Sequence, residues 1–353
     1  MSQSENYEAV VTDSASEVAH FDEGKRGIVG RFHHALHTTP ALVPLIVLVG
    51  AVVIFGLLLG SRFFSPFALT LILQQVQIVG IVAAAQSLVI LTAGIDLSVG
   101  AIAVISSVVM GQFTFRYGLP PAVAVTFGLA FGTAIGALNG WLVARMKLPP
   151  FIVTLGMWQI VLAANFLYSA NETIRSQDIA GEAPLLQLLG AKFKLGGAVF
   201  TLGVVFMVLL VVVLAYVLKH TAWGRHVYAV GDDPEAAELS GVNVKGVLIS
   251  VYALAGLICA FAGWALIGRI GSVSPTSGQL LNIESITAVV IGGISLFGGR
   301  GSILGTFFGA LIVGVFTLGL RLAGADAQWT FLLIGALIIG AVAVDQWIRK
   351  VAA

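Results

Sequence analysis

Charged residues are scarce in this sequence. Asp, Glu, Lys and Arg make up only 10% of the 353 residues, whereas 58% are hydrophobic. Soluble domains carry charge on roughly a quarter of their residues, so too few polar side chains remain here to cover a water-soluble globule. The composition predicts a membrane protein surrounded by lipid. The formal net charge of +1 offers no basic surface of the kind that binds nucleic acid, and we expect no nucleic-acid partner.

Catalytic and metal-binding motifs are also missing. The single cysteine, Cys259, lies in an apolar run, which excludes an intrachain disulfide or a cysteine-rich metal site. The chain has no G-x-x-x-x-G-K-S/T phosphate loop, no H-E-x-x-H and no G-x-S-x-G. We therefore expect no catalytic residue, no metal site and no cofactor bound by this chain, which argues against an enzyme.

Long apolar segments fill most of the chain. A helix needs about 20 mostly apolar residues to cross the hydrocarbon core of a bilayer, because each residue rises about 1.5 Å. This criterion predicts an all-α, polytopic transmembrane bundle of about ten spans. The connections near Gly94 and Gly299 are so short that one adjoining segment could be re-entrant. The predicted spans cover residues 41–60, 67–93, 97–115, 120–144, 150–169, 198–218, 246–268, 283–298, 302–322 and 328–348.

The distribution of Lys and Arg predicts the orientation. An even number of spans puts both termini on one side, and basic residues concentrate in cytoplasmic segments. With both termini inside, 11 of the 18 Lys and Arg residues fall in inner segments and 7 in outer ones. We therefore expect both termini in the cytoplasm. Residues 1–38 would form a polar cytoplasmic tail without a cleavable signal peptide, and residues 39–350 a single transmembrane domain.

Glycine is abundant, with 42 residues. Several glycines recur at a spacing of four residues, for example Gly128, Gly132 and Gly136. This spacing lets helices in lipid pack closely. Residues 94–100 also match residues 293–299 at Gly, Ile, Leu and Gly, and residues 132–138 match residues 305–311. Duplicated halves with glycine-interrupted helices are frequent in transporters, so the pattern points to an internal repeat, although chance matches are common in a glycine-rich sequence.

The most informative hydrophilic stretch is residues 219–245, on the predicted cytoplasmic side. Asp233 is suited to N-cap a short helix, with Pro234 at its first position and Glu235 near its positive end. Gly241 stands where this helix would stop. The local chemistry predicts a surface helix of about two turns, and leaves open whether that helix is a capped connector or a contact segment.

Asp96 is a carboxylate between two apolar segments. Ionisable groups are rare inside membranes and often mark pathways. Asp96 is also placed to cap the helix predicted to begin at Leu97, by accepting a hydrogen bond from the amide of Ser98 or Val99. We favour capping and the fixing of a hinge over contact with cargo. The residues predicted to form helix breaks or hinges are Gly94, Asp96, Ser98, Gly100, Gly298 and Gly299.

Several further polar side chains lie in otherwise apolar segments. Hydrogen bonds between helices explain such residues at least as often as cargo binding does. Glu284 either starts a helix at the outer interface or reaches the pathway. The candidate residues for a substrate pathway are Gln74, Gln77, Asp96, Gln159, Asn165 and Glu284.

Four blocks of sequence, in this order, carry a resemblance to a known family. They are residues 91–100 (LTAGIDLSVG), residues 138–156 (with LNGWLVAR and PPFIVTLG), residues 224–241 (GRHVYAVGDDPEAAELSG) and residues 298–306 (GGRGS followed by GT). The chain resembles the ribose-type monosaccharide permeases of bacterial ABC importers over roughly residues 40–350. Its longer N-terminal tail is the clearest departure.

The resemblance implies a function and partners. A multi-pass permease of the bacterial inner membrane would move a monosaccharide such as ribose, xylose, fructose or galactose, or a related polyol. Two permease subunits, expected to be a homodimer in lipid, would assemble with cytoplasmic ATPase subunits that hold ATP and Mg, and a periplasmic sugar-binding protein would deliver the cargo. The alternative is an ion-gradient-driven secondary transporter with Asp96 and Glu284 as coupling carboxylates. The resemblance assigns ATPase coupling to Gly231, Asp232, Asp233, Pro234, Glu235, Ala236, Ala237, Leu239 and Gly241.

Overall fold

The apolar segments of the sequence fold into helices that pack side by side. The structure is a computed structural model that describes residues 41–352. The prediction of a polar tail over residues 1–38 lies outside the described residues. The helices begin where local chemistry favours it, because a proline opens α4, α6, α7 and α11 and an Asn, Asp, Ser or Thr side chain caps several others.

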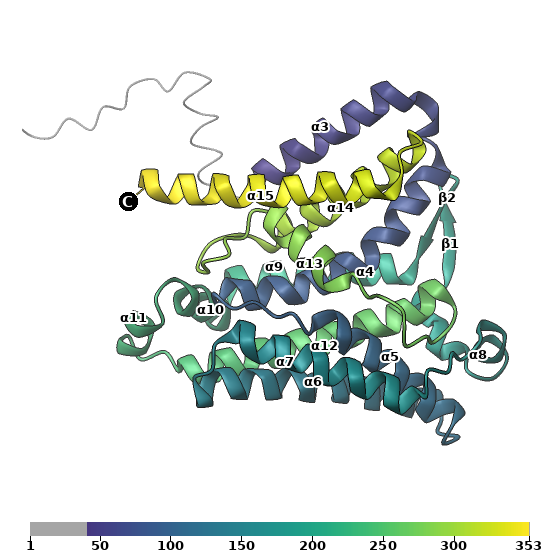
Figure 1. The fold of residues 1–353 in the computed structure, drawn as a ribbon, viewed down its shortest axis with the longest axis horizontal. Helices are drawn as coiled ribbons and strands as arrows, with labels where there is room; N and C mark the ends of the chain where they lie inside the picture. The colour runs from purple at the N-terminus through teal and green to yellow at the C-terminus, as the bar shows by residue number, and fades with distance from the viewer. Residues whose placement is uncertain (1–40, 353) are drawn as a thin grey trace, which may run out of the picture. The chain divides into compact units, whose positions relative to one another are not determined.

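The elements are labelled in Figure 1. The helices are α3 (Leu42–Leu59), α4 (Pro66–Leu91), α5 (Val99–Phe115), α6 (Pro121–Met146), α7 (Pro150–Ser169), α8 (Ser176–Glu182), α9 (Leu202–His220), α10 (Ala222–Asp232), α11 (Pro234–Leu239), α12 (Val244–Ile270), α13 (Leu281–Ile291), α14 (Ile303–Leu322) and α15 (Ala327–Ala352). The short elements are the 3-10 helices η1 (Gly60–Arg62) and η2 (Pro184–Gly190) and the strands β1 (Lys192–Leu195) and β2 (Ala198–Thr201).

The predicted polytopic helical architecture is confirmed at the level of class. Of the described helices, 7 are long and apolar enough to cross a membrane. The other three predicted segments correspond to shorter apolar stretches, namely α5, α13 and residues 328–343 of α15. The helix boundaries agree best where a proline or a capping residue marks them, as at Pro66, Pro121 and Pro150.

Two boundaries differ from the prediction for a physical reason. The predicted span 283–298 is helical only to Ile291, because Gly292 ends the helix and Gly293 has a φ of 79°. Its 11 residues extend about 16 Å, half of the hydrocarbon core. The predicted span 198–218 starts as strand β2 and becomes helical only at Leu202.

A small β-hairpin interrupts the all-α prediction. β1 and β2 are antiparallel, with Lys192 opposite Thr201. Gly196 and Gly197 form the turn with φ values of 59° and 83°, and positive φ at both central residues gives the type of turn that matches the twist of a hairpin. The Gly196–Gly197 pair is therefore the sequence signal for this hairpin.

Close backbone packing around α12 builds the core. Helix α12 lies against α4, α5 and α6. A Cβ atom added at Gly136 of α6 would lie 2.9 Å from the Cα atom of Gly256 on α12, and one added at Gly256 would collide with the carbonyl oxygen of Gly132. The glycines at four-residue spacing therefore do what their pattern predicted. Cys259, also on α12, is fully buried and free.

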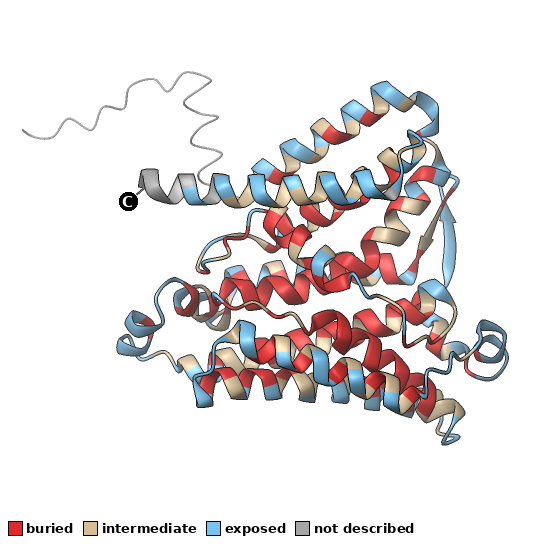
Figure 2. Ribbon diagram, viewed as in Figure 1, coloured by how far each residue is buried: buried red, intermediate tan, exposed pale blue. Residues whose placement is uncertain are grey.

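The loop elements gather at opposite ends of the helical unit. Helices α10 and α11 lie at one end, and α8 with the β-hairpin lies at the other (Figure 1). Buried residues concentrate in the central helices, whereas α3 and α15 expose much of their length (Figure 2). The unit thus presents two polar ends separated by a band of apolar helices.

Candidate functional site

Helices α10 and α11 form a compact, capped segment between α9 and α12. The Thr221 hydroxyl accepts a hydrogen bond from the Gly224 amide at 3.1 Å and caps α10. The Asp233 Oδ1 atom accepts from the amides of Glu235 and Ala236, both at 2.9 Å, and caps α11. Pro234 occupies the first turn. The capped two-turn helix predicted from the sequence is confirmed.

Helix α11 turns one small side chain inward and a large apolar one outward. Ala237 is 5% exposed, whereas Leu239 is 90% exposed. Asp232, Asp233, Glu235 and Glu238 are also exposed. The helix ends at Leu239, and Gly241, whose φ is 86°, turns the chain away two residues later. Leu239 is thus a single large exposed apolar side chain among exposed carboxylates.

The C-terminal end of α10 meets two interruptions between helices, the first helix break (residues 92–98) and the second helix break (residues 292–302). We call the contact among Leu91, Gly231, Gly298 and Gly299 the glycine junction. The amide of Gly299 donates to the carbonyl oxygen of Leu91, the last residue of α4, at 3.0 Å. A Cβ atom at Gly231 would collide with that same carbonyl and lie 2.7 Å from the Gly299 nitrogen. A Cβ atom at Gly299 would lie 2.8 Å from Asp232. Only glycine allows the three backbones to approach so closely.

Two side chains fasten α10 to its neighbours. The Tyr228 hydroxyl donates to the carbonyl oxygen of Gly301 at 3.0 Å, and the Trp223 indole N–H donates to the Ser250 hydroxyl of α12 at 2.8 Å. Burial raises the pKa of the Tyr228 hydroxyl above its usual value, so the group stays protonated and keeps donating. Helix α10 is thereby fixed both to the second helix break and to α12.

The first helix break, residues 92–98, is held by side-chain hydrogen bonds. The Asp96 Oδ1 atom accepts from the Ser98 amide at 2.7 Å and from the Ser98 hydroxyl at 2.6 Å. The Asn139 side chain of α6 donates to the same hydroxyl at 3.0 Å. The predicted contact of Asp96 with the Ser98 amide is confirmed, but the helix starts at Val99, two residues later than expected. Gly100 is already helical.

Gln86 and Thr154 complete this network. The Gln86 side-chain amide faces the backbone of Asp96. It can donate to the Asp96 carbonyl oxygen (2.9 Å) and accept from the Asp96 amide (3.3 Å) when its nitrogen is turned toward that carbonyl. The Thr154 hydroxyl of α7 donates to the carbonyl oxygen of Ile95 at 2.9 Å. Gln86 was visible in the sequence as a polar residue in an apolar helix, but its partner, a backbone segment ten residues later, could not be read from local pattern.

The second helix break, residues 292–302, is held by backbone conformation. Gly293, Gly298, Gly299 and Gly301 have φ values of 79°, 81°, 69° and 129°. The Ser295 amide donates to the carbonyl oxygen of Arg300 at 3.1 Å, closing the loop. The two stretches that resemble each other in sequence are therefore both interruptions between helices, while the proposed internal repeat remains a prediction.

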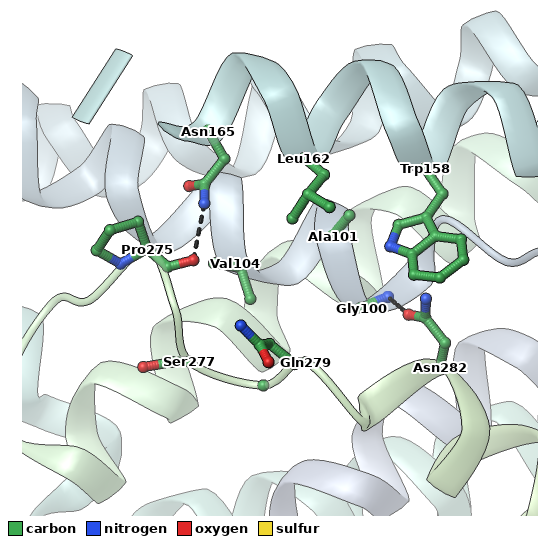
Figure 3. Close-up of a pocket in the computed structure, with 11 residues that line it drawn as sticks. Gly100, Ala101, Val104, Trp158, Leu162, Asn165, Pro275, Ser277, Gln279 and Asn282 are labelled. Carbon is green, nitrogen blue, oxygen red and sulfur yellow. Dashed lines mark hydrogen bonds between the residues drawn. The ribbon is translucent and has the colours of Figure 1, made fainter. Parts of the chain in front are cut away.

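A small cavity lies between α5, α7 and the segment before α13, and we call it the amide pocket (Figure 3). The Asn165 Nδ2 atom donates to the carbonyl oxygen of Pro275 at 2.9 Å. The Asn282 Oδ1 atom accepts from the Gly100 amide at 2.8 Å and joins the start of α5 to the start of α13. The cavity measures about 30 Å³. The lining residues are Gly100, Ala101, Val104, Trp158, Leu162, Asn165, Pro275, Ser277, Gly278, Gln279 and Asn282.

The other candidate pathway residues do not converge on one cavity. Gln77 is buried and accepts a hydrogen bond from the Thr201 hydroxyl at the start of α9. Gln74 is half-buried, and Gln159 lies on the exposed face of α7, opposite to the buried Asn165. Asp96 belongs to the first break. Of these residues, only Asn165 lines the amide pocket.

Glu284 and Arg269 belong to a cluster of polar side chains, of which only Glu284 was predicted from the sequence as a candidate site residue. Glu284 is half-buried in the first turn of α13. The Arg269 guanidinium, at the end of α12, donates to the Gln75 side chain at 2.8 Å. Arg269 is also close enough to Glu284 for their charges to interact. Only the fold brings Arg269 to Gln75, which is 194 residues away in the sequence.

Comparison with known proteins identifies the family. The family described as branched-chain amino acid transport system / permease component matches residues 68–342. The fructose import permease of Rhizobium meliloti is 71% identical over 99% of this chain and 97% of its own length. The ribose import permease of Bacillus subtilis is 37% identical over 83% and 89%, and the galactose/methyl galactoside import permease of Escherichia coli is 34% identical over 84% and 90%. No solved structure matches the chain.

The match bears directly on the site, because it covers both helix breaks, the glycine junction and α10–α11. Each of these relatives aligns with more than four fifths of the chain and of its own length. The resemblance noted from four sequence blocks is therefore confirmed across the full transmembrane unit. The chain belongs to the family of transport-system permease components that includes these import permeases.

Proposed function

We propose that this chain is the permease subunit of an ABC importer for a monosaccharide, with fructose as the first candidate. The relatives described above are named for fructose, ribose and galactose import, and the fructose import permease shares 71% identity. The family description names branched-chain amino acids, but it is broader than the names of the individual relatives. ATP binding and hydrolysis would belong to a separate subunit, and a sugar-binding protein would deliver the cargo.

The observation that carries the proposal is the exposed helix α11 joined through α10 to the glycine junction. In the proposed assembly, α11 docks on the cytoplasmic ATPase through Leu239 and the carboxylates around it. Residues 231–241 then form the coupling segment. The Asp233 cap and Pro234 keep α11 preformed, which lowers the entropy lost on docking. Such a helix transmits force better than a flexible loop, since its own shape is fixed.

The glycine junction would carry movement of α10 into the membrane. Because Gly231 touches both helix breaks without an intervening side chain, a displacement of α10 must displace α4 and the second break together. Gly94, Asp96, Ser98 and Gly100 would act at the first break, and Gly298 and Gly299 at the second. Rocking of elements around such breaks is a general way to alternate access to a central site.

The proposed topology follows from the two ends of the unit. If α11 meets a cytoplasmic ATPase, the hairpin end faces the periplasm, and α15 runs toward the α11 end (Figure 1). That arrangement supports both termini in the cytoplasm and about ten passes, with α5, α13 and part of α15 as the short ones. A homodimer in lipid would complete the pore, and Gln159 reaches the pathway only if the exposed face of α7 meets the second subunit.

Reconstitution of the complete transporter tests the proposal. The permease, its cognate ATPase and the binding protein are placed in lipid vesicles, and ATP hydrolysis and fructose uptake are measured. Fructose-loaded binding protein should raise hydrolysis, and fructose should enter only when ATP is present. Uptake driven by a proton or sodium gradient without ATP would contradict the proposal and favour the ion-gradient alternative, with Asp96 and Glu284 as the coupling groups.

A further inference from the structure

The amide pocket is chemically unusual for the interior of a transmembrane bundle. Three amide side chains, Asn165, Gln279 and Asn282, and the indole of Trp158 surround one cavity (Figure 3). Polar groups at this depth are costly and are kept either as structural hydrogen bonds or for function. The question is how much of this polarity the fold itself uses.

Only some of these polar atoms make hydrogen bonds that hold the fold together. Asn282 has a structural role, because its Oδ1 atom caps the start of α5 at Gly100. Asn165 also has a structural role through one end of its side-chain amide, since its Nδ2 atom donates to the carbonyl oxygen of Pro275. The Asn165 Oδ1 atom is buried without a hydrogen-bond partner among the described residues, and the residue as a whole is 1% exposed. A buried acceptor without a donor is unfavourable, so this atom calls for a ligand or a water molecule that donates a hydrogen bond.

The pocket also has the two kinds of surface that a sugar presents. A monosaccharide has hydroxyl groups around its edge and a C–H face that is apolar. The indole of Trp158 offers a flat apolar surface on one side of the pocket, while Asn165 and Gln279 offer amide donors and acceptors on the other (Figure 3). Small-molecule sites combine a mostly apolar lining with a few such polar groups.

The pocket is smaller than a sugar molecule. A volume of about 30 Å³ has room for one or two water molecules, so a sugar can enter only if the wall moves. The wall includes Gly100 at the start of α5 and Asn282 at the start of α13, and their hydrogen bond crosses between the two interrupted helices. Movement at the first break would therefore widen the pocket, and transporter sites commonly lie beside such interrupted helices.

We propose that the amide pocket is a contact site for the monosaccharide during translocation. Trp158 packs against the C–H face of the sugar, and Asn165 and Gln279 hydrogen-bond its hydroxyl groups. This inference rests on the proposed function, and it adds the residues that contact the sugar inside the membrane.

Transport by the complete reconstituted transporter tests the pocket. Sugar imported per ATP hydrolysed is measured with saturating fructose-loaded binding protein. Trp158→Leu and Asn165→Leu should each lower this ratio about tenfold or more, the size expected when one well-placed contact is lost. Trp158→Phe, which keeps a ring face, should lower it less. Trp141→Leu on the exposed side of α6 is the matched control. Ratios for Trp158→Leu and Asn165→Leu equal to that of the control would overturn the inference.

A second measurement does not depend on removing a native group. Leu162→Cys places a thiol in the pocket, and Leu167→Cys places one on the same helix at a position that is 83% exposed. The native Cys259 is buried, so labelling by methyl methanethiosulfonate reports the new thiol. High fructose concentrations should slow labelling at position 162 several-fold and leave position 167 unchanged. Labelling is carried out on the complete transporter with ATP and binding protein present, so that the wall of the pocket can move. Equal rates with and without fructose at position 162, while ATP-driven fructose import proceeds, would overturn the inference and leave the proposed function standing.

Discussion

Both helix breaks interrupt the path between two helices, but different interactions fix the backbone in each. In the first break, residues 92–98, side chains hold the backbone, because Asp96 accepts two hydrogen bonds from Ser98 and Asn139 adds a third contact to the same hydroxyl. In the second, residues 292–302, glycines with positive φ hold the path of the chain. The start of the first break and the middle of the second both meet Gly231 at the glycine junction.

This difference determines which substitutions each break tolerates. The first break should be sensitive to loss of polar atoms, because a buried donor left without a partner costs about 1–3 kcal/mol. The second should be sensitive to gain of a Cβ atom, because left-handed backbone costs a non-glycine residue about 1–2 kcal/mol. The substitutions below test that contrast at the junction and at each break, from the largest expected effect to the smallest.

Gly231→Ala should have the largest effect, because it disturbs both breaks at once. Its Cβ atom would collide with the backbone oxygen of Leu91, and backbone cannot move aside as a side chain can. Overpacking of this kind costs about 1–3 kcal/mol or more. Thermal unfolding of the purified protein measures the loss. Gly156→Ala is the control, because its added methyl group meets nothing within 4 Å, and it should change the unfolding midpoint little. Equal midpoints for the two variants would show that close packing at the glycine junction does not contribute to stability.

Asp96→Leu should be the next most harmful, because it leaves the Ser98 amide and hydroxyl without their acceptor. The expected loss is about 1–3 kcal/mol. Asp96→Asn keeps an acceptor oxygen and should retain most of the stability. The unfolding midpoints of the two variants are compared with that of the native chain. If Asp96→Asn is as unstable as Asp96→Leu, the charge rather than the hydrogen bonds holds the break.

Gly299→Ala should be less severe and separates two causes in the second break. Its φ of 69° and its approach to Asp232, 2.8 Å from an added Cβ atom, both disfavour alanine. Gly118 has a φ of 66° but nothing within 4 Å, so Gly118→Ala measures the conformational cost alone, about 1–2 kcal/mol. Gly299→Ala should lower the unfolding midpoint further than Gly118→Ala does. Equal shifts would mean that the contact with α10 contributes nothing.

Tyr228→Phe should have the smallest effect, about 1 kcal/mol from one hydrogen bond to Gly301. Burial raises the pKa of Tyr228 above its ordinary value of 10.0. Its contribution is therefore fully present below pH 10 and is lost as the pH rises through the raised pKa. Unfolding midpoints measured across this range should fall less steeply for Tyr228→Phe than for the native chain. Identical slopes would show that Tyr228 does not titrate with unfolding.

Local sequence rules predicted much of this molecule. Most of the features that they did not predict depend on long-range contacts. The Asp233 cap, Pro234 and the contact of Asp96 with Ser98 were predictable because each partner lies within three residues. Helix α13 and strand β2 lie within segments that apolar length alone predicts to be continuous spans, although the pairs Gly292–Gly293 and Gly196–Gly197 mark the interruptions. The glycine junction and the contact of Arg269 with Gln75 could not be predicted, since they join segments that only the fold brings together.

The most direct test of the account is whether α11 docks on the ATPase. Leu239→Asp alters a side chain that is 90% exposed, so the fold should be unaffected. Leu195→Asp is the control, because Leu195 is 66% exposed in the hairpin at the opposite end. The affinity of each purified variant for the cognate ATPase is measured. The account predicts that binding weakens about tenfold or more for Leu239→Asp, with no change for Leu195→Asp, and equal affinities for both variants would contradict it.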